Sequence, residues 1–141
     1  MTNTYFSTLT PTEKLIWACG LFEVEGCFSI KKANAKKHTH AYISANLGTT
    51  DKDAIEQFHS IVGFGKLYGP YMFKKATKPI YRWSTTQTED VQKLIKLFYP
   101  LLSDRRQSRC RELLELAENI GPKGSQFRVW DYPDNLLYEA A

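Results

Sequence analysis

Two carboxylates stand close together where a predicted helix ends, and they are the residues most able to do chemistry. Thr10 and Glu13 form a capping-box signature, which predicts that a helix begins here. The helix then runs to Glu23 and Glu25, at its C-terminal pole, where the helix dipole disfavours negative charge. We therefore expect a cation to compensate these acids.

The residues around the pair predict how two such acids could meet. Gly26 suits the left-handed position that follows many helices, and it would leave Glu25 at the helix end. One face of the helix, at helical spacing, holds the candidate dimer-interface residues Ile16, Cys19, Gly20 and Glu23. Two copies packed through the small Gly20 would bring two Glu25 carboxylates together. A divalent cation between them would relieve their repulsion and form a site of hard oxygen ligands.

The stretch from Ala18 to Gly26 resembles the nine-residue signature of the LAGLIDADG homing endonucleases, in the single-motif form. The matching positions are Gly20, Leu21, the acids at 23 and 25, and Gly26. Cys19 replaces the usual small residue, and glutamate replaces aspartate at both acidic positions. The resemblance also covers the order of predicted elements over about residues 10 to 120.

This resemblance implies a metal site. Glu25 occupies the position of the family's essential acid and would bind Mg²⁺, with the Val24 carbonyl as a second oxygen ligand. Mn²⁺ or Ca²⁺ would be able to substitute in binding. Glu23 would support the helix end and its packing.

The resemblance also implies two further catalytic positions. Arg105 stands where the family usually has a lysine, and arginine keeps the charge but cannot give up a proton. Thr49 or Thr50 stands where a longer polar residue usually positions water. Both departures favour DNA binding over efficient cleavage.

A single signature in the chain predicts only half of an active site. Pairing of two subunits through the helix over residues 13–25 would complete it, and the two-fold axis would demand a roughly palindromic target. We therefore expect a homodimer acting on double-stranded DNA, with no small-molecule substrate.

The elements that must position these residues follow in the order α-β-β-α-β-β-α-α. Alternation predicts strands over 28–31 and from His40, joined by a loop over 33–39, and strands over 66–73 and 79–86. Helical spacing predicts a helix capped by Thr50, one opened by Glu89 and Asp90, and one capped by Ser103. The residues expected to face the core are Ala41, Ile43, Ala45 and Leu47 of the second strand and Val91, Leu94, Ile95 and Phe98 of the helix opened by Glu89. The expected fold is α+β, the αββαββα(α) fold of these endonucleases, with a four-stranded antiparallel sheet covered by helices on one face.

The other face of this sheet is expected to remain open and to bind the DNA major groove, with further contacts from the loops. The candidate DNA-binding residues are Ser29, Lys31, Lys36, Lys37, His40, Tyr42, Ser44, Asn46, Lys66, Tyr68, Lys74, Lys75, Arg82 and Ser84. Charge supports this surface, since residues 27–50 and 66–88 hold nine of the 19 Lys and Arg but none of the 15 Asp and Glu.

Composition sets outer limits. With 141 residues, the chain is expected to form a single domain, with a core over about 10–120 and a docking tail over about 121–141. Its three cysteines have no metal-ligand spacing, and their odd number favours a reducing intracellular environment. No apolar run approaches the length of a membrane span.

The leading hypothesis is thus a homodimeric, Mg²⁺-dependent, site-specific DNA endonuclease of the kind encoded within introns or inteins. One alternative is a catalytically inactive DNA-binding protein on the same scaffold. A second is an RNA-binding intron maturase, and a third is a structural basic module that binds DNA weakly and without sequence preference.

Overall fold

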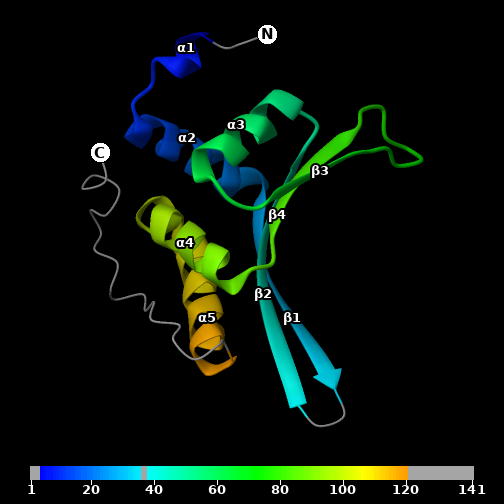
Figure 1. The fold of residues 1–141 in the computed structure, drawn as a ribbon, viewed down its shortest axis with the longest axis vertical. Helices are drawn as coiled ribbons and strands as arrows, with labels where there is room; N and C mark the ends of the chain where they lie inside the picture. Colours follow the sequence, from blue (N-terminus) through cyan, green and yellow to red (C-terminus); the bar gives the residue numbers. More distant parts are fainter. Residues whose placement is uncertain (1–3, 36–37, 121–141) are drawn as a thin grey trace.

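The protein, described by a computed structural model, is a layer of helices against one four-stranded sheet (Figure 1). The structure describes residues 4–35 and 38–120; the predicted tail over 121–141 and Lys36 and Lys37 lie outside them. The helices are α1 (Thr4–Ser7), α2 (Pro11–Glu25), α3 (Lys52–Val62), α4 (Thr88–Phe98) and α5 (Asp104–Ile120), with a short 3-10 helix, η1 (Tyr99–Leu101). The strands are β1 (Gly26–Ala35), β2 (His38–Thr49), β3 (Lys66–Tyr71) and β4 (Ile80–Thr85).

The sheet is antiparallel with strand order β1-β2-β4-β3, and α2 to α5 pack against one of its faces, as the sequence predicted. The predicted loop over 33–39 is wrong at both ends. The β1–β2 pairing continues through Asn34 and Thr39 to Ala35 and His38, so both ends of the predicted loop belong to the strands. This hairpin therefore extends well beyond the layer of helices (Figure 1).

The start of α2 follows the prediction, but its end does not. The Glu13 N–H donates to the Thr10 hydroxyl over 3.1 Å, and the Glu13 carboxylate accepts from the Thr10 N–H over 2.8 Å. Gly26 has φ −86° and ψ 166°, which is extended and not left-handed backbone, because it already begins β1. Glycine is required at this position for a different reason, because a Cβ here would collide with the ring of Phe22.

The core that holds α2 against the sheet is aromatic. Phe22 packs on Phe28 of β1, with ring centroids 4.8 Å apart, and Phe58 of α3 packs edge-on against Trp83 of β4 at 4.9 Å. Phe98 of α4 completes the cluster, and all of these side chains are buried. The predicted inward residues of β2 and α4 are confirmed as core: Ile43, Ala45, Leu47, Val91, Leu94 and Ile95.

Two helix starts can be compared with the predictions. Ser103 caps α5 as expected, since its hydroxyl accepts from the Arg106 N–H. Helix α3 is capped by Asp51 and not by Thr50, because the Asp51 carboxylate reaches the Ala54 N–H at 3.1 Å. None of the helices in the described ranges is long and apolar enough to span a membrane.

Candidate active site and nucleic-acid interface

Glu25 is the last residue of α2, at the point where the chain turns into the sheet. Its side chain is exposed, and no described residue forms a hydrogen bond or ion pair with it. The next residue but one, Cys27, already belongs to the open face of β1. The structure therefore places an uncompensated carboxylate where the helix layer meets the edge of the open face.

Glu23 has a different environment from Glu25, because its carboxylate contacts the start of α5. One carboxylate oxygen accepts from the Ser103 N–H over 2.7 Å, and the other forms an ion pair with Arg106 at 3.0 Å without hydrogen-bond alignment. Arg106 also donates to the Glu23 carbonyl over 2.9 Å and lies over the Phe22 ring. The cation expected at the helix pole is thus Arg106, and it ties the end of α2 to the start of α5.

The contacts between α2 and α5 predict a large difference between two adjacent arginines. Arg106→Ala would leave the partly buried Glu23 carboxylate without its cation and is expected to lower the free energy of unfolding by about 1–3 kcal/mol. Arg105→Ala removes an exposed side chain and is expected to change it by less than about 0.5 kcal/mol. Urea denaturation of both variants measures the difference, and equal destabilisation would contradict the assigned contacts.

The exposed face of α2 also differs from the predicted one. Cys19 is 2% exposed, and its thiol points to the Phe98 carbonyl at 3.7 Å, so it belongs to the core and not to an interface. The exposed stripe consists instead of Ile16, Gly20 and Val24, with Ile16 44% and Val24 76% exposed. A Cβ added at Gly20 would meet no atom within 4 Å. The spacing of four residues between Ile16, Gly20 and Val24 is present in the sequence, but no local pattern indicates which of the two apolar faces of α2 is buried.

The three cysteines are expected to differ in their reactivity toward alkylating reagents. Burial, reinforced by nearby Glu23, raises the pKa of the Cys19 thiol to about 12, and burial also raises the pKa of Cys110 to about 12. At about pH 8 roughly one in 10,000 of these thiols is ionised, so alkylation of the native protein should modify only the exposed Cys27. Mass spectrometry of peptides after timed labelling measures this, and comparable labelling of all three would contradict the described core.

Arg105 and Thr49 lie at two borders of the region around Glu25. Arg105 is exposed and lines a hollow of about 530 Å³ whose other walls are Gly26, Cys27, Phe28, Arg106, Ser108, Arg109 and Glu112. Thr49 ends β2, two residues beyond the partner of Gly26, and its hydroxyl accepts from the Asp51 N–H over 3.1 Å. Arg105 is thus beside the residue that follows Glu25, while the Thr49 oxygen already has a partner.

One chain supplies only some of the oxygen ligands that a hard divalent cation needs. Glu25 offers a carboxylate. The Val24 carbonyl lies in the last turn of α2, where carbonyl oxygens have no N–H donor within the helix. No three His, Cys, Asp or Glu side chains of the described ranges gather into a cluster. Such a set suits Mg²⁺, which binds one or two carboxylates and takes its other oxygens from water and phosphates.

The open face is built from side chains that meet across all four strands. The pairings align Cys27, Asn46, Ser84 and Lys66 in one row, and Gly48, Arg82 and Tyr68 in the next. Ser29 pairs with Ser44, and the backbones of Lys31 and His40 pair with Tyr42 and Ala33. Alternation therefore brings eight of the predicted polar residues to one face: Ser29, Tyr42, Ser44, Asn46, Lys66, Tyr68, Arg82 and Ser84. It also adds Cys27 and Gly48, which were not among the predicted residues.

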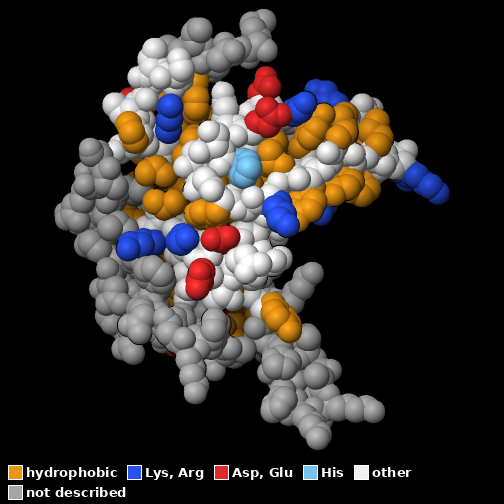
Figure 2. All heavy atoms as spheres, viewed as in Figure 1, with side chains coloured by type: hydrophobic (Ala, Val, Ile, Leu, Met, Phe, Trp, Pro, Cys, Tyr) orange, Lys and Arg blue, Asp and Glu red, His pale blue; other side chains and the backbone are white. Residues whose placement is uncertain are grey.

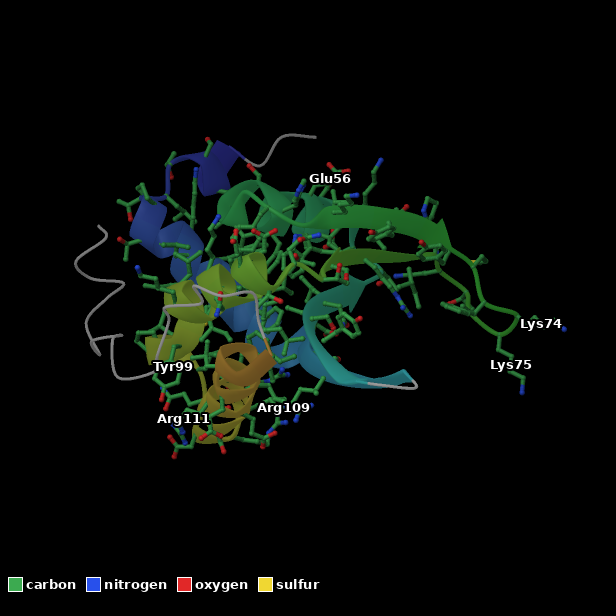
Figure 3. The ribbon with its side chains drawn as sticks, turned by 60° about the horizontal axis from the view of Figure 1, so that its bottom comes forward. Glu56, Lys74, Lys75, Tyr99, Arg109 and Arg111 are labelled. Atoms are coloured by element: carbon green, nitrogen blue, oxygen red, sulfur yellow. The ribbon has the colours of Figure 1, made fainter. Side chains whose placement is uncertain are left out.

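Two of the candidate DNA-binding lysines lie at the end of the β3–β4 hairpin. Lys74 and Lys75 project from the end of the β3–β4 hairpin, away from the body of the molecule (Figure 3). Lys78 is also exposed on the returning segment. Arg109 and Arg111 lie on α5 instead, where Arg109 pairs with Glu112 at 2.8 Å and Arg111 donates to the Tyr99 hydroxyl.

Comparison with known proteins adds a family and a fold. A family model described as LAGLIDADG endonuclease matches residues 18–108. The archaeal intron-encoded homing endonuclease I-Vdi141I, complexed with DNA, is similar with a TM-score of 0.59 and 16% identity, over 92% of this chain and 95% of that chain. No curated protein sequence matches the chain.

Two further solved structures are similar over most of their length. The homing endonuclease I-CvuI, in complex with the I-CreI target in the presence of Mg, gives a TM-score of 0.55 at 14% identity, over 92% of both chains. The group I intron-encoded homing endonuclease I-CeuI, complexed with DNA, gives 0.58 at 10% identity, over 89% of this chain and 76% of that chain. These similarities confirm the α+β fold predicted from the sequence.

Proposed function

We propose that this chain, which belongs to the LAGLIDADG endonuclease family, is a homodimeric, divalent-metal-dependent endonuclease that cuts a long, roughly palindromic DNA site. The observation that supports this most is the exposed Glu25 carboxylate, which lies beside an open sheet face and has no partner among residues 4–35 and 38–120. The segments that form that face, residues 27–50 and 66–88, contain no acid. The solved structures that share the fold include endonucleases complexed with DNA.

The open face is suited to duplex DNA. Lys66, Arg82 and Asn46 present donors that favour guanine and adenine edges in the major groove, which is wide enough for a two-stranded ribbon. Lys74 and Lys75, which project from the end of the hairpin, would contact phosphates. Phosphate contacts would fix the register, and the rows of strand residues would read the sequence.

Glu25 and the Val24 carbonyl would hold the cation. When bound, a divalent cation such as Mg²⁺ supplies an activated water and neutralises charge at the scissile phosphate. Glu25 would orient it from the end of α2, a position that the Glu23–Arg106 contacts hold fixed against α5. The Arg105 guanidinium, beside Gly26, would stabilise charge that develops on the phosphate.

The dimer would form along the exposed stripe of Ile16, Gly20 and Val24. These residues lie on the opposite side of α2 from the buried Ala18 and Phe22, so a second α2 could pack there without disturbing the core. Each subunit would then contribute one Glu25 near the two-fold axis. The two open faces would follow successive major grooves on either side of it.

The experiment that tests this function is selection of cleaved sites from a random duplex library in the presence of Mg²⁺. A long site with two-fold symmetry is the expected result. If library members are bound specifically but never nicked, the catalytically inactive DNA-binding protein becomes the better description. That second candidate is favoured by the Thr49 hydroxyl, which already accepts a hydrogen bond, and by arginine at position 105. A stronger affinity for structured RNA than for any duplex DNA would contradict both.

A further inference from the structure

The β3–β4 hairpin carries exposed apolar side chains that the core does not use. Met72 is 63% exposed and Phe73 51% exposed, and Tyr71 next to them is also exposed. Figure 2 shows hydrophobic side chains along this projecting arm, with lysine at its end. The buried core lies between the sheet and the helices, so packing within one chain gives these residues no function.

A turn fixes how these side chains and the lysines are arranged. The Ala76 N–H donates to the Phe73 carbonyl over 2.9 Å, which closes a turn with Lys74 and Lys75 as its two central residues. The two charges therefore occupy the end of the hairpin, and Met72 and Phe73 lie immediately behind them. We refer to residues 71–76 as the β3–β4 tip.

An irregularity in the strand pairing turns part of the tip toward the open face. Tyr68 lies opposite Arg82, but the register shifts before the next pair, so that Tyr71 lies opposite Ile80. Arg82 and Ile80 are two residues apart on β4 and share a face. Tyr71 therefore belongs to the same face as Tyr68 and Arg82, which regular alternation from Tyr68 would not give. Bulges of this kind often re-aim a side chain at a functional surface.

The charges around the tip indicate its partner. Five basic residues and no acid occur between Lys66 and Thr88, so the surface is complementary to a polyanion. Flat or flexible apolar side chains framed by cations match duplex DNA, in which an apolar stack of bases lies between two lines of phosphates. A protein partner would not by itself account for a basic frame without any acid.

We propose that the β3–β4 tip is a wedge that inserts Met72 and Phe73 against a base step of duplex DNA, with Lys74 and Lys75 on the flanking phosphates. Partial unstacking of that step would favour sequences that deform easily, so the tip would read a position without contacting its base edges. This inference rests on the proposed function, because it assigns the tip to the same DNA as the open face.

The test uses the full-length protein and the site recovered by selection, made as a series of duplexes with 2-aminopurine at successive positions. Unstacking raises 2-aminopurine fluorescence, so we expect a rise at one position in each half-site for the unaltered protein. The double variant Met72→Ser with Phe73→Ser should lose this rise and bind about 10- to 30-fold more weakly. Its melting temperature should not change, because both side chains are exposed.

Two further variants separate the wedge from its charges. Met72→Leu with Phe73→Leu keeps apolar bulk and should keep most of the fluorescence rise. Lys74→Ala with Lys75→Ala should keep the rise but reduce the slope of log Kd against log salt by about 0.9 for each phosphate that the protein no longer neutralises. A rise that the serine variant retains would overturn the wedge.

The outcomes also distinguish the wedge from the function on which it rests. If the unaltered protein binds and cuts its site but no position shows a fluorescence rise, the wedge is wrong and the endonuclease proposal stands. If the unaltered protein binds no duplex DNA, the endonuclease proposal fails first. A serine variant that loses affinity for a protein or an RNA, but not for DNA, would overturn the wedge in favour of that partner.

Discussion

Glu25→Gln is expected to reduce strand scission on the order of 1,000-fold or more, while Kd for the DNA site stays within about threefold. The amide has nearly the same shape as the carboxylate but lacks the charge that holds a divalent cation. Because Glu25 is exposed and no described residue pairs with it, the fold should tolerate the change. Plasmid nicking with Mg²⁺ measures scission, and fluorescence anisotropy with Ca²⁺ measures binding.

The stability of the same variant provides an independent check. The substitution removes a negative charge from the C-terminal pole of α2, which should raise the free energy of unfolding by about 0.3–1 kcal/mol. Glu23→Gln is the matched control, since it weakens the contacts to Ser103 and Arg106 and should destabilise the protein. A Glu25→Gln protein that cuts at the normal rate would remove the basis of the proposed mechanism, as would one that loses binding and folding together.

Gly20→Arg is expected to convert the proposed dimer into a folded monomer and to reduce double-strand cleavage by at least about 100-fold. In the single chain a Cβ added at this exposed position meets no atom within 4 Å, so the side chain can extend into solvent and the fold should accept arginine. Between two closely packed α2 helices the same side chain would have no room and would bury an unpaired charge. Sedimentation equilibrium measures the oligomeric state, and circular dichroism confirms the fold.

Gly20→Ala is the matched control for this pair of helices. Alanine removes the cost of glycine within a helix and should stabilise α2 by about 0.8–1.0 kcal/mol. It adds only one methyl group to the exposed stripe, so we expect the variant to remain dimeric. If Gly20→Arg is still a dimer that cleaves DNA, the subunits meet elsewhere and the single-motif site is not completed through α2.

Local patterns in the sequence predicted most of the elements and the identity of the open face. Strict alternation placed Ile43, Ala45 and Leu47 inside, and the capping box at Thr10 and Glu13 fixed the start of α2. These features depend on neighbours within a few residues, and such neighbours can be read from the order of the chain.

The differences at Glu23 and Cys19 come from contacts between elements, whereas the errors at Gly26, at the cap of α3 and in the loop over 33–39 are local. The Glu23–Arg106 contact joins residues 83 apart, so no local pattern indicated that Glu23 faces α5. Cys19 is buried and Val24 is exposed. The sequence could not predict this, because α2 has apolar residues on two faces and only tertiary packing determines which face is buried. Gly26 is required by the Phe22 ring and not by a left-handed turn.

The rows of side chains on the open face also bear on how such a protein can evolve. Asn46, Ser84, Lys66 and Arg82 are absent from the hydrophobic core, and substitutions at such positions usually change stability by no more than about 0.5 kcal/mol. Mutations can therefore accumulate there without loss of the folded state. If the proposed function holds, this scaffold can therefore acquire new recognition sequences without changes in the residues that pack α2 on the sheet.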